Sequence, residues 1–365
     1  MPKYKIAWLP GDGIGVDVMD AARIVLDRID LDAEYIHGDI GWEFWVNEGD
    51  ALPKRTLDLM KETDCAFFGA ITSKGKEASE KELAPALQGK GFAYRSPIVR
   101  MRQILDLYIC LRPIKAYPGN PLNYKDGIDL VVFRENTEGM YIGIEYAQVP
   151  EEMFAIKGME KLPRDAAISI RAITPAASER IVRAAFEFAR KSNRRRVTAV
   201  HKANVLRMTD AVFMDAARKV AAEYPDIPFD DANIDAMGMW LLKNPLNYDV
   251  LVTTNLFGDI LSDLCAQMVG GLGFGCSGNI GSQYAVFEPT HGSAPKYAGQ
   301  YKTNPIATIL AAKMMLEWLG EAEKAAQVEG ATAAVIAEGK VRTYDMGGKN
   351  STIEVAKEIA RFATA

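Results

Sequence analysis

The feature that most constrains this chain is the alternation of short apolar runs with longer stretches of helical periodicity. Residues Tyr4 to Leu9 form a strand-like run, and apolar residues from Val18 to Ile29 then recur at helical spacing. Ile181 to Phe188 shows the same helical spacing. Four further runs are expected to be strands: Cys65 to Ile71, Leu130 to Phe133, Val197 to Val200 and Val250 to Thr253. This alternation predicts an α/β fold with a largely parallel sheet covered by helices.

Three segments interrupt the alternation. Lys74 to Lys90 is rich in charge and alanine, which predicts an exposed loop carrying a short helix. Ala147 to Arg164 is polar and contains two prolines, so we expect an arm or linker that reaches outside the domain. Gly270 to Gly281 holds six glycines in twelve residues, which predicts a loop throughout.

Composition and charge exclude several classes of protein. The chain has 365 residues, and 43 Lys and Arg against 48 Asp and Glu give a net charge of −5, so no basic excess is available to bind nucleic acid. No apolar run reaches the length of about 18 residues that predicts a membrane-spanning helix, and no secretory signal is recognisable. The four cysteines are far apart in apolar segments. We therefore expect reduced core thiols in a cytoplasmic protein.

A glycine-rich turn, Gly11 to Gly15, follows the first expected strand and precedes a helix. Glycines at such a place allow backbone N–H groups to approach a phosphate, as in dinucleotide-binding loops. The third glycine comes one position too early for that fingerprint. The spacing therefore favours a tight strand-to-helix turn lining a cleft over a pyrophosphate site.

Several expected strands end in polar residues. Arg134 follows one strand, His201 and Lys202 follow another, and Asn255 follows a third. Ligands of open α/β sheets bind outside the carboxyl ends of the strands. These ends are therefore candidates for an active site.

Two carboxylates, Asp259 and Asp263, stand at positions i and i+4 of an expected helix and so share one face. Like charges placed in this way repel one another unless a cation joins them. Oxygen ligands without nearby Cys or His suit Mg²⁺ or Mn²⁺, and Asp235 could complete the set. The alternative is one carboxylate favoured by the helix dipole beside a solvated neighbour.

Arginines form a second group of candidates. Guanidinium groups bind carboxylates with two hydrogen bonds, so Arg102, Arg112 and Arg134 near one metal would suit a polycarboxylate substrate. The alternative is that each is a surface arginine whose stem covers apolar area.

At six places the motifs of the chain are specific enough to compare with a known family. They are Leu9 to Gly15, Leu105 to Pro113, Phe133 to Gly139, His201 to Asn204, Asn255 to Asp263 and Glu288 to Pro295. With these motifs in order over nearly its whole length, the chain resembles the β-decarboxylating dehydrogenases of isocitrate, 3-isopropylmalate, homoisocitrate and tartrate.

The resemblance implies a three-layer α/β fold of the isopropylmalate dehydrogenase type, distinct from the Rossmann fold. Residues 1–106 and 270–365 would form a large domain that carries the cofactor loop. Residues 107–269 would form a smaller central domain with the dimer interface and the metal ligands, and an arm at about 147–169. The resemblance also implies a homodimer whose subunits complete each other's active sites.

The resemblance implies that three arginines hold the carboxylates of the substrate: Arg102, Arg112 and Arg134. It implies three ligands for Mg²⁺ or Mn²⁺: Asp259, Asp263 and, from the partner chain, Asp235. Lys202 of the partner chain would deprotonate the substrate hydroxyl, and Tyr141 would protonate the enol carbon after CO₂ has left.

The resemblance also implies a cofactor site. Thr72 and Asn204 would lie near the nicotinamide. The other cofactor-binding residues would be Glu288, His291, Gly292, Ser293, Ala294, Lys296, Tyr297, Asn304 and Tyr344. Lys296 and Tyr297 stand where NAD-using members carry an acidic and an aliphatic residue, which favours NADP. Gly348 departs from that pattern because bacterial NADP-dependent isocitrate enzymes place an arginine there, so NAD stays possible.

Substrate identity depends on the segment before Arg102. Ser96 matches the serine of isocitrate enzymes, whereas Ile98 is apolar, as in isopropylmalate enzymes. We expect the oxidation of isocitrate to 2-oxoglutarate with NADP, as in the tricarboxylic acid cycle. The alternative is a 3-isopropylmalate or homoisocitrate dehydrogenase that uses NAD. A regulatory subunit without activity would be expected to have lost arginines or metal ligands, and this chain retains them.

Overall fold

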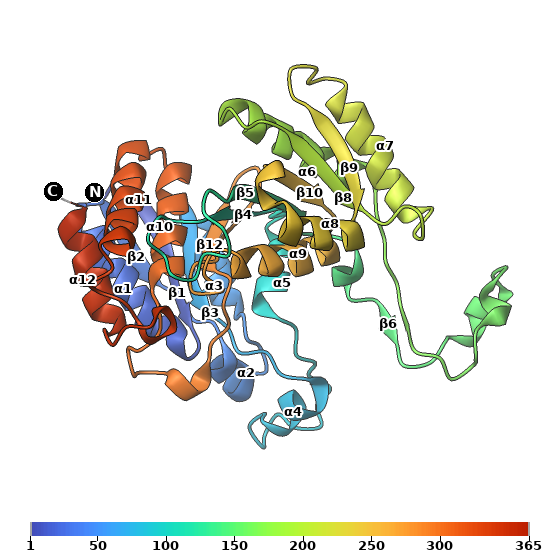
Figure 1. Cartoon of the computed structure of the whole chain (residues 1–365). Coiled ribbons are helices and arrows are strands. Elements are labelled where there is room, and N and C mark those ends of the chain that lie inside the picture. The colour runs from blue at the N-terminus through green and yellow to red at the C-terminus, as the bar shows by residue number, and fades with distance from the viewer. Residues whose placement is uncertain (1, 364–365) are drawn as a thin grey trace.

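A computed structural model describes residues 2–363 (Figure 1). Its strands are β1 (Tyr4–Gly11), β2 (Ala33–His37), β3 (Cys65–Ala70), β4 (Ile109–Lys115), β5 (Asp129–Glu135), β6 (Glu145–Tyr146), β7 (Ile168–Ser169), β8 (Val197–His201), β9 (Phe229–Asn233), β10 (Val250–Thr253), β11 (Cys276–Ile280) and β12 (Ala285–Pro289). Ten of them form one sheet in the order β2-β1-β3-β12-β11-β4-β5-β10-β8-β9, and β6 and β7 form a separate hairpin. The expected strands are therefore all present.

The helices are α1 (Ile14–Arg28), α2 (Trp42–Glu48), α3 (Lys54–Lys61), α4 (Lys76–Lys81), α5 (Pro97–Ile104), α6 (Pro175–Lys191), α7 (Thr209–Ala221), α8 (Ile234–Lys243), α9 (Asn255–Gln267), α10 (Ile306–Trp318), α11 (Ala322–Glu338) and α12 (Thr352–Phe362). Short 3₁₀ turns are η1 (Met140–Ile142), η2 (Glu151–Ala155), η3 (Met159–Lys161), η4 (Pro245–Asn247), η5 (Pro295–Tyr297) and η6 (Tyr344–Met346).

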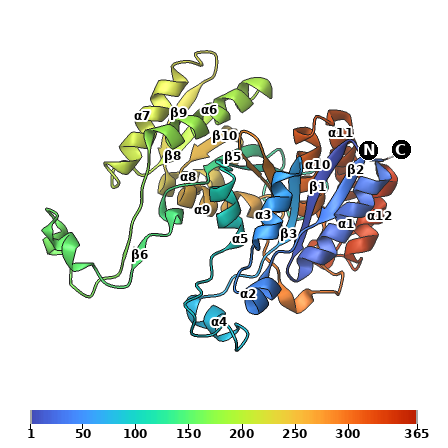
Figure 2. The ribbon, with the colours of Figure 1, turned by 180° about the vertical axis from the view of Figure 1, so that it is seen from behind.

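Helices cover both faces of the sheet, as the two opposite views show (Figures 1 and 2). On one face α1, α10, α11 and α12 pack over β1 and β3, and α6 and α7 pack over β5, β8 and β10. On the other face α3 and α5 cover the first half of the sheet, and α8 and α9 cover the second. The predicted three-layer α/β class is confirmed.

The sheet is largely parallel, as predicted, but its centre is not. β11 runs antiparallel to both β12 and β4, and β4 runs antiparallel to β5. Along β4 the side chains alternate between faces: Leu111 packs against the α6 side, whereas Arg112 contacts α9. Therefore β4 carries Arg112 on the face where α9 begins.

The prediction of a loop throughout Gly270 to Gly281 is wrong for its second half, which contains β11. The glycines there serve close packing as well as turning. A Cβ at Gly275 would lie 2.2 Å from Oγ1 of Thr290, and one at Gly278 would lie 3.1 Å from Cε of Met314. Glycine content alone therefore did not distinguish a closely packed strand from a loop.

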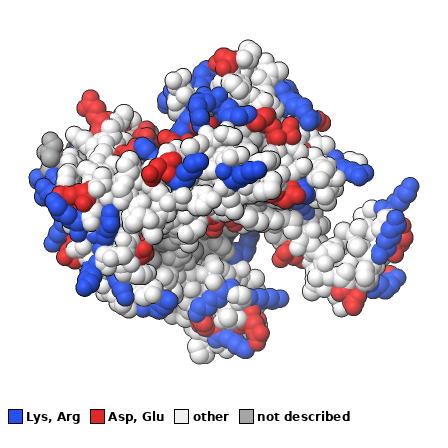
Figure 3. Space-filling view, in the orientation of Figure 1, with Lys and Arg blue, Asp and Glu red and all other residues white. Residues whose placement is uncertain are grey.

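The two other irregular segments have the expected character. Lys74 to Lys90 contains only the short helix α4. The segment from Ala147 to Arg164 contains η2 and η3 and, flanked by the β6–β7 hairpin, projects from the body of the molecule (Figures 1 and 3).

The turn Gly11 to Gly15 is a tight turn whose amides are used by the protein itself. The N–H of Asp12 donates to the carbonyl of Ala70, at 2.8 Å, and the N–H of Ile14 donates to the carbonyl of Ser293, at 2.8 Å. A Cβ at Gly13, whose φ is +58°, would lie 2.1 Å from that Ser293 oxygen. The tight turn favoured by the spacing is thus what the structure contains.

All four cysteines are buried and free, as expected. Within residues 2–363, no helix combines the length and the apolar composition that are needed to cross a bilayer. The face in Figure 3 mixes acidic and basic side chains, in keeping with the small net charge.

The division into domains at residues 106/107 and 269/270 stays a prediction, but one ion-pair cluster joins elements from both sides of it. Glu329 of α11 pairs with Lys115 of β4, with an Nζ–Oε1 distance of 2.6 Å, and with Lys313 of α10, with an Nζ–Oε2 distance of 3.3 Å. Burial alone would raise the pKa of Glu329, but the two lysines outweigh it and leave the pKa lowered.

Glu329→Gln is expected to lower the free energy of unfolding at pH 7 by about 1–2 kcal/mol. The reason is that these partly buried ion pairs should contribute more than exposed salt bridges and less than fully buried ones. The folded pKa lies below the unfolded value of about 4.3, so the contribution is complete above that value and is lost as the pH falls through the folded pKa. Urea denaturation of wild type and variant at pH 7 and at steps down to about pH 2, so that the series passes through the lowered pKa of Glu329, measures the difference. A difference that does not shrink toward acid pH would contradict this account.

Candidate active site

Polar side chains meet at the carboxyl ends of β5 and β10. Arg134 of β5 is 1% exposed, and its Nε and Nη2 donate to Oδ1 of Asn255 at 3.0 and 2.8 Å. Its Nη1 also pairs with Asp259. Gly258 permits this approach, since a Cβ there would lie 2.5 Å from Cγ of Arg134. Arg134 and Asn255 thus lie together at these strand ends, and their role in an active site stays a prediction.

The two aspartates of α9 share one face with Arg112. The Nη1 atom of Arg112 lies 3.1 Å from Oδ1 of Asp263 and 3.7 Å from Oδ1 of Asp259. It also donates to Oγ of Ser262 at 2.6 Å. Burial alone would raise the pKa of Asp259, but Arg134, Tyr141 and Arg112 outweigh it and the pKa is lowered. Burial raises the pKa of Asp263, partly offset by Arg112. The site thus holds Asp259 as a carboxylate at neutral pH.

Arg102 reaches the same place from α5. Its Nε donates to Oδ1 of Asn279 at 2.9 Å, and its Nη2 lies 3.3 Å from Oε1 of Glu288. Asn279 also donates to Glu288, at 2.7 Å. Glu288 therefore lies at the arginine end of the site, although it was expected to bind the cofactor. Asn279 went unnoticed because it lies in the segment interpreted as a loop.

Tyr141 lies on η1 beside these charges. Its hydroxyl donates to Asp259, and the guanidinium of Arg134 lies 5.0 Å from the centre of its ring. Burial and the hydrogen bond to Asp259 raise the pKa of Tyr141. The phenol therefore keeps its proton at neutral pH and can act as an acid.

Most of these residues line one cavity of about 340 Å³, whereas Asn255, Asp263 and Asn279 are not among its lining residues. Of the predicted site residues, it contains Ser96, Arg102, Arg112, Arg134, Tyr141, Asp259, Glu288, His291 and Gly292. Apolar side chains line it as well, among them Ile71, Ile98 and Val99. The cavity therefore combines three guanidinium groups with an apolar wall. The sequence motifs point to Ile98 as part of this wall, but not to Ile71 or Val99.

Two more of the predicted cofactor-binding residues, Thr72 and Ser293, contact each other, and His291 lines this cavity. Thr72 Oγ1 and Ser293 Oγ are 2.7 Å apart. His291 has a buried Nε2 without a partner among the described residues, and burial lowers its pKa. An unpaired buried nitrogen at this place would suit a polar group of a bound cofactor.

The predicted adenosine residues form a cluster of aromatic rings and lysines. The rings of Tyr297 and Tyr344 have centres 6.1 Å apart. Lys296 Nζ lies 4.7 Å from the centre of the Tyr297 ring, and Lys302 Nζ lies 5.0 Å from that of Tyr344. Lys302 was missed because no pattern in the sequence connects it with these rings.

Two further residues of this loop are accounted for. Asn304 is buried and donates to Asp345, with an Nδ2–Oδ2 distance of 3.1 Å. Ala294 adopts a left-handed conformation, with φ +35°, at the turn before η5. Both residues thus shape the backbone of the expected cofactor loop.

Lys202, Asn204 and Asp235 do not line this cavity. Lys202 Nζ pairs with Oδ1 of Asp235 at 2.6 Å, and the side chain of Asp235 is 67% exposed. Asn204 is exposed on the turn after β8. Within residues 2–363, no three His, Cys, Asp or Glu side chains gather closely enough to hold a metal ion. A single chain therefore brings together two of the three predicted metal ligands.

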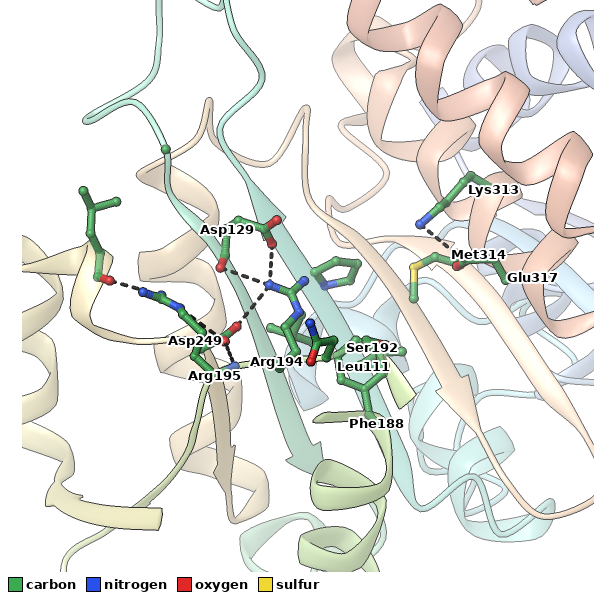
Figure 4. A pocket seen from close by; sticks show the side chains of 15 residues that line it. Leu111, Asp129, Phe188, Ser192, Arg194, Arg195, Asp249, Lys313, Met314 and Glu317 are labelled. Carbon is green, nitrogen blue, oxygen red and sulfur yellow. Dashed lines mark hydrogen bonds and ion pairs between the residues drawn. The ribbon is translucent and has the colours of Figure 1, made fainter. Parts of the chain in front are cut away.

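A second cavity, of about 720 Å³, lies on the other face of the sheet between α6 and α10 (Figure 4). Leu111 and Pro113 line it, and they flank Arg112 along β4. Arg194 points into it between Asp129 and Asp249. The side chains that line this cavity include none of the predicted site residues.

Comparison with known proteins agrees with this geometry. The family model described as isocitrate/isopropylmalate dehydrogenase matches residues 5–359. The 3-isopropylmalate dehydrogenase of Methanothermobacter thermautotrophicus is 44% identical, with 99% of each chain covered. The homoisocitrate dehydrogenase of Methanocaldococcus jannaschii is 40% identical over 98% of this chain and 97% of its own.

A solved structure extends the agreement to the fold. The crystal structure of isocitrate dehydrogenase from Methylococcus capsulatus superposes with a TM-score of 0.88 at 39% identity, covering 99% of this chain and 100% of that one. The expected fold type is thereby confirmed. The chain belongs to the isocitrate/isopropylmalate dehydrogenase family of decarboxylating dehydrogenases and is an oxidoreductase.

Proposed function

We propose that the protein catalyses the oxidative decarboxylation of a 2-hydroxy-3-carboxy acid with an alkyl group at C3, for which 3-isopropylmalate is the model, using NADP and Mg²⁺ or Mn²⁺. One observation carries the substrate class: Ile71, Ile98 and Val99 line the same cavity as the three arginines. An alkyl group gains from burial against such a wall, whereas a third carboxylate would lose its hydration there. Among the relatives, two 3-isopropylmalate dehydrogenases at 44% identity support this substrate class over isocitrate.

The arginines bind and orient the substrate. Arg102, Arg112 and Arg134 are all buried, and each offers planar N–H groups that match a carboxylate. Their three positive charges are balanced by Asp259, Asp263 and Glu288. A divalent cation bound at the aspartates would leave an excess of two positive charges, which a dianionic malate derivative neutralises.

The donor set fits a hard divalent cation, because Asp259 and Asp263 offer carboxylate oxygens on one face of α9. Asp235 of the partner chain would supply the third carboxylate. When bound, the cation supplies Lewis acidity toward the oxygen atoms of the substrate.

Proton transfers fall to two side chains. Lys202 would reach the active site of the partner chain and there, as the neutral amine, accept the proton of the substrate hydroxyl. In the single chain its ammonium pairs with Asp235 at 2.6 Å. Tyr141, a phenol that is protonated at neutral pH, donates its proton to the carbon from which CO₂ has left. A homodimer with shared sites follows from this assignment.

The choice of NADP rests on the cluster of Lys296, Tyr297, Lys302 and Tyr344. Two ammonium groups and two phenols donate to a 2′-phosphate, whereas an acidic residue at position 296 would repel it. NAD lacks the group that these donors would bind.

Isocitrate is the second candidate substrate. Ser96 lines the cavity and offers a hydroxyl that could bind a distal carboxylate. The solved structure of similar fold is an isocitrate dehydrogenase, which supports this candidate.

Absorbance at 340 nm with a panel of substrates and both cofactors tests the proposal. We expect the highest kcat/KM with 3-isopropylmalate and NADP⁺, complete loss of turnover with excess EDTA, and recovery on adding Mg²⁺ or Mn²⁺. Ile98→Asn is expected to lower kcat/KM for 3-isopropylmalate about tenfold or more, since it places an amide against the alkyl group. Efficient turnover of isocitrate alone would select the second candidate, and preference for NAD⁺ would refute the role of the lysine cluster.

A further inference from the structure

Asp17, on the first turn of α1, is a buried carboxylate whose oxygens are both used by one loop. It is 1% exposed and accepts hydrogen bonds from the N–H of Gly299, at 3.1 Å, and from the N–H of Tyr301, at 2.9 Å. Gly299 and Tyr301 lie in the loop between η5 and α10, which carries the predicted adenosine residues. The Asp17 carboxylate on α1 therefore binds the backbone of this loop.

Tyr301 adopts a conformation that needs such support. Its φ of +47° lies in the left-handed region, which costs free energy for a residue with a side chain. Its hydroxyl donates to Asp20 at 2.8 Å, and its carbonyl accepts from the N–H of Thr352 at 2.7 Å. With the bond to Asp17, three contacts fix this residue. Lys302 follows directly and so lies over the rings of Tyr297 and Tyr344.

Asp12, in the glycine-rich turn before α1, holds the opposite side of the site in the same way. Its Oδ2 accepts from the N–H of Thr72 and its Oδ1 from the N–H of Trp42, both at 2.7 Å. Burial raises the pKa of this carboxyl. Thr72 in turn contacts Ser293, so Asp12 fixes the pair expected beside the nicotinamide.

We propose that Asp12 and Asp17 are positioning residues that hold the nicotinamide-side and adenosine-side loops in their binding conformations before the cofactor arrives. This inference rests on the proposed cofactor site. It gives the glycine-rich turn a role different from that of a phosphate-binding loop. The turn packs against Ala70 and Ser293, and the carboxylates beside it act through the backbone of the loops. A loop that is already ordered loses less entropy when it binds, so affinity rises without any direct contact.

The rigidity of α1 supports this role. Its apolar face is buried in the core shared with α10, α11 and α12, where Val18, Ala22 and Val25 are fully buried. Because the helix is well packed, Asp17 is held in a fixed position, and so is the loop that it binds.

Asp17→Asn keeps the shape of the side chain but replaces one acceptor with a donor. We expect KM for the cofactor and the inhibition constant of ADP-ribose, or of its 2′-phosphate form, to rise about tenfold, because a charge-assisted hydrogen bond is lost. We expect kcat and the thermal midpoint to change little, and Asp17→Glu to recover part of the affinity. Asp27→Asn is the matched control: it changes a carboxylate of the same helix that pairs with Arg23 at the surface, away from the loop, and should leave the inhibition constant unchanged.

Asp12→Asn should change kcat and leave the inhibition constant of ADP-ribose unchanged, the reverse of the effect expected for Asp17→Asn. We expect kcat to fall about tenfold, while the inhibition constant of ADP-ribose, which lacks the nicotinamide, stays at the wild-type value. A merely structural role would lower thermal stability and change both constants together in both variants, which would overturn the proposal.

If a variant does not fold, hydrogen exchange on the wild-type protein tests the proposal instead. The amides of Gly299 and Tyr301 should exchange slowly without cofactor, and fast exchange that slows only on adding ADP-ribose would overturn the inference. Failure of the proposed function can be told apart from failure of this inference. If the proposed function is wrong, the wild-type protein itself will not bind ADP-ribose or its 2′-phosphate and will not turn over any substrate of the panel.

Discussion

Tyr141→Phe is expected to lower kcat about 10²- to 10⁴-fold, the range by which a positioned acid or base accelerates proton transfer. The hydroxyl is held by Asp259 next to Arg134, and a phenol keeps its proton at neutral pH, so it can donate that proton. The ring remains in the variant, so the cavity keeps its shape and KM for the substrate should change little. Steady-state kinetics with the preferred substrate of the panel measures both constants.

Tyr4→Phe provides the matched control. Its hydroxyl also bonds to a carboxylate, Glu321, at 2.8 Å, but it lies at the start of β1, away from the cavity. The control should retain wild-type kcat. If Tyr141→Phe lowers kcat by less than threefold while the control is unchanged, another group donates the proton and the assignment of Tyr141 is wrong.

The layers of the fold were predictable from the sequence because local patterns encode them. The runs at Cys65 and Val250 became fully buried strands and the run at Tyr4 a partly buried one, since apolar residues bounded by polar ones favour the interior of a parallel sheet. β11 was not predictable in this way. Its glycine, Gly278, packs closely against Met314, which lies 36 residues further along the sequence.

The candidate site was predictable to a similar extent. Arg134 and Asp259 stand in motifs that resemble those of a known family, and the structure brings them together. Asn279 and Lys302 act through contacts that only the folded chain creates. The partners of Asp17 are 282 and 284 residues distant, so no local pattern could have revealed them.

The second large effect concerns sharing of active sites between two chains. Lys202 and Asp235 do not line the cavity that contains Tyr141 and Asp259, although both pairs are expected to act on one substrate. If a partner chain supplies Lys202, then Lys202→Ala and Tyr141→Phe should each be nearly inactive as homodimers. A heterodimer of the two variants would contain one site with both native residues.

Mixing the two variants under conditions of subunit exchange should therefore restore activity. Random pairing makes half of the dimers mixed, each with one intact site of two, so recovery should approach about a quarter of wild-type activity. Native mass spectrometry measures the fraction of heterodimers in the same sample, and a mixture of Lys202→Ala with Lys202→Ala,Tyr141→Phe is the control that can form no intact site. Heterodimers without recovered activity would mean that Lys202 and Tyr141 act within one chain, and then the pair Lys202–Asp235 must move toward the cavity of its own subunit.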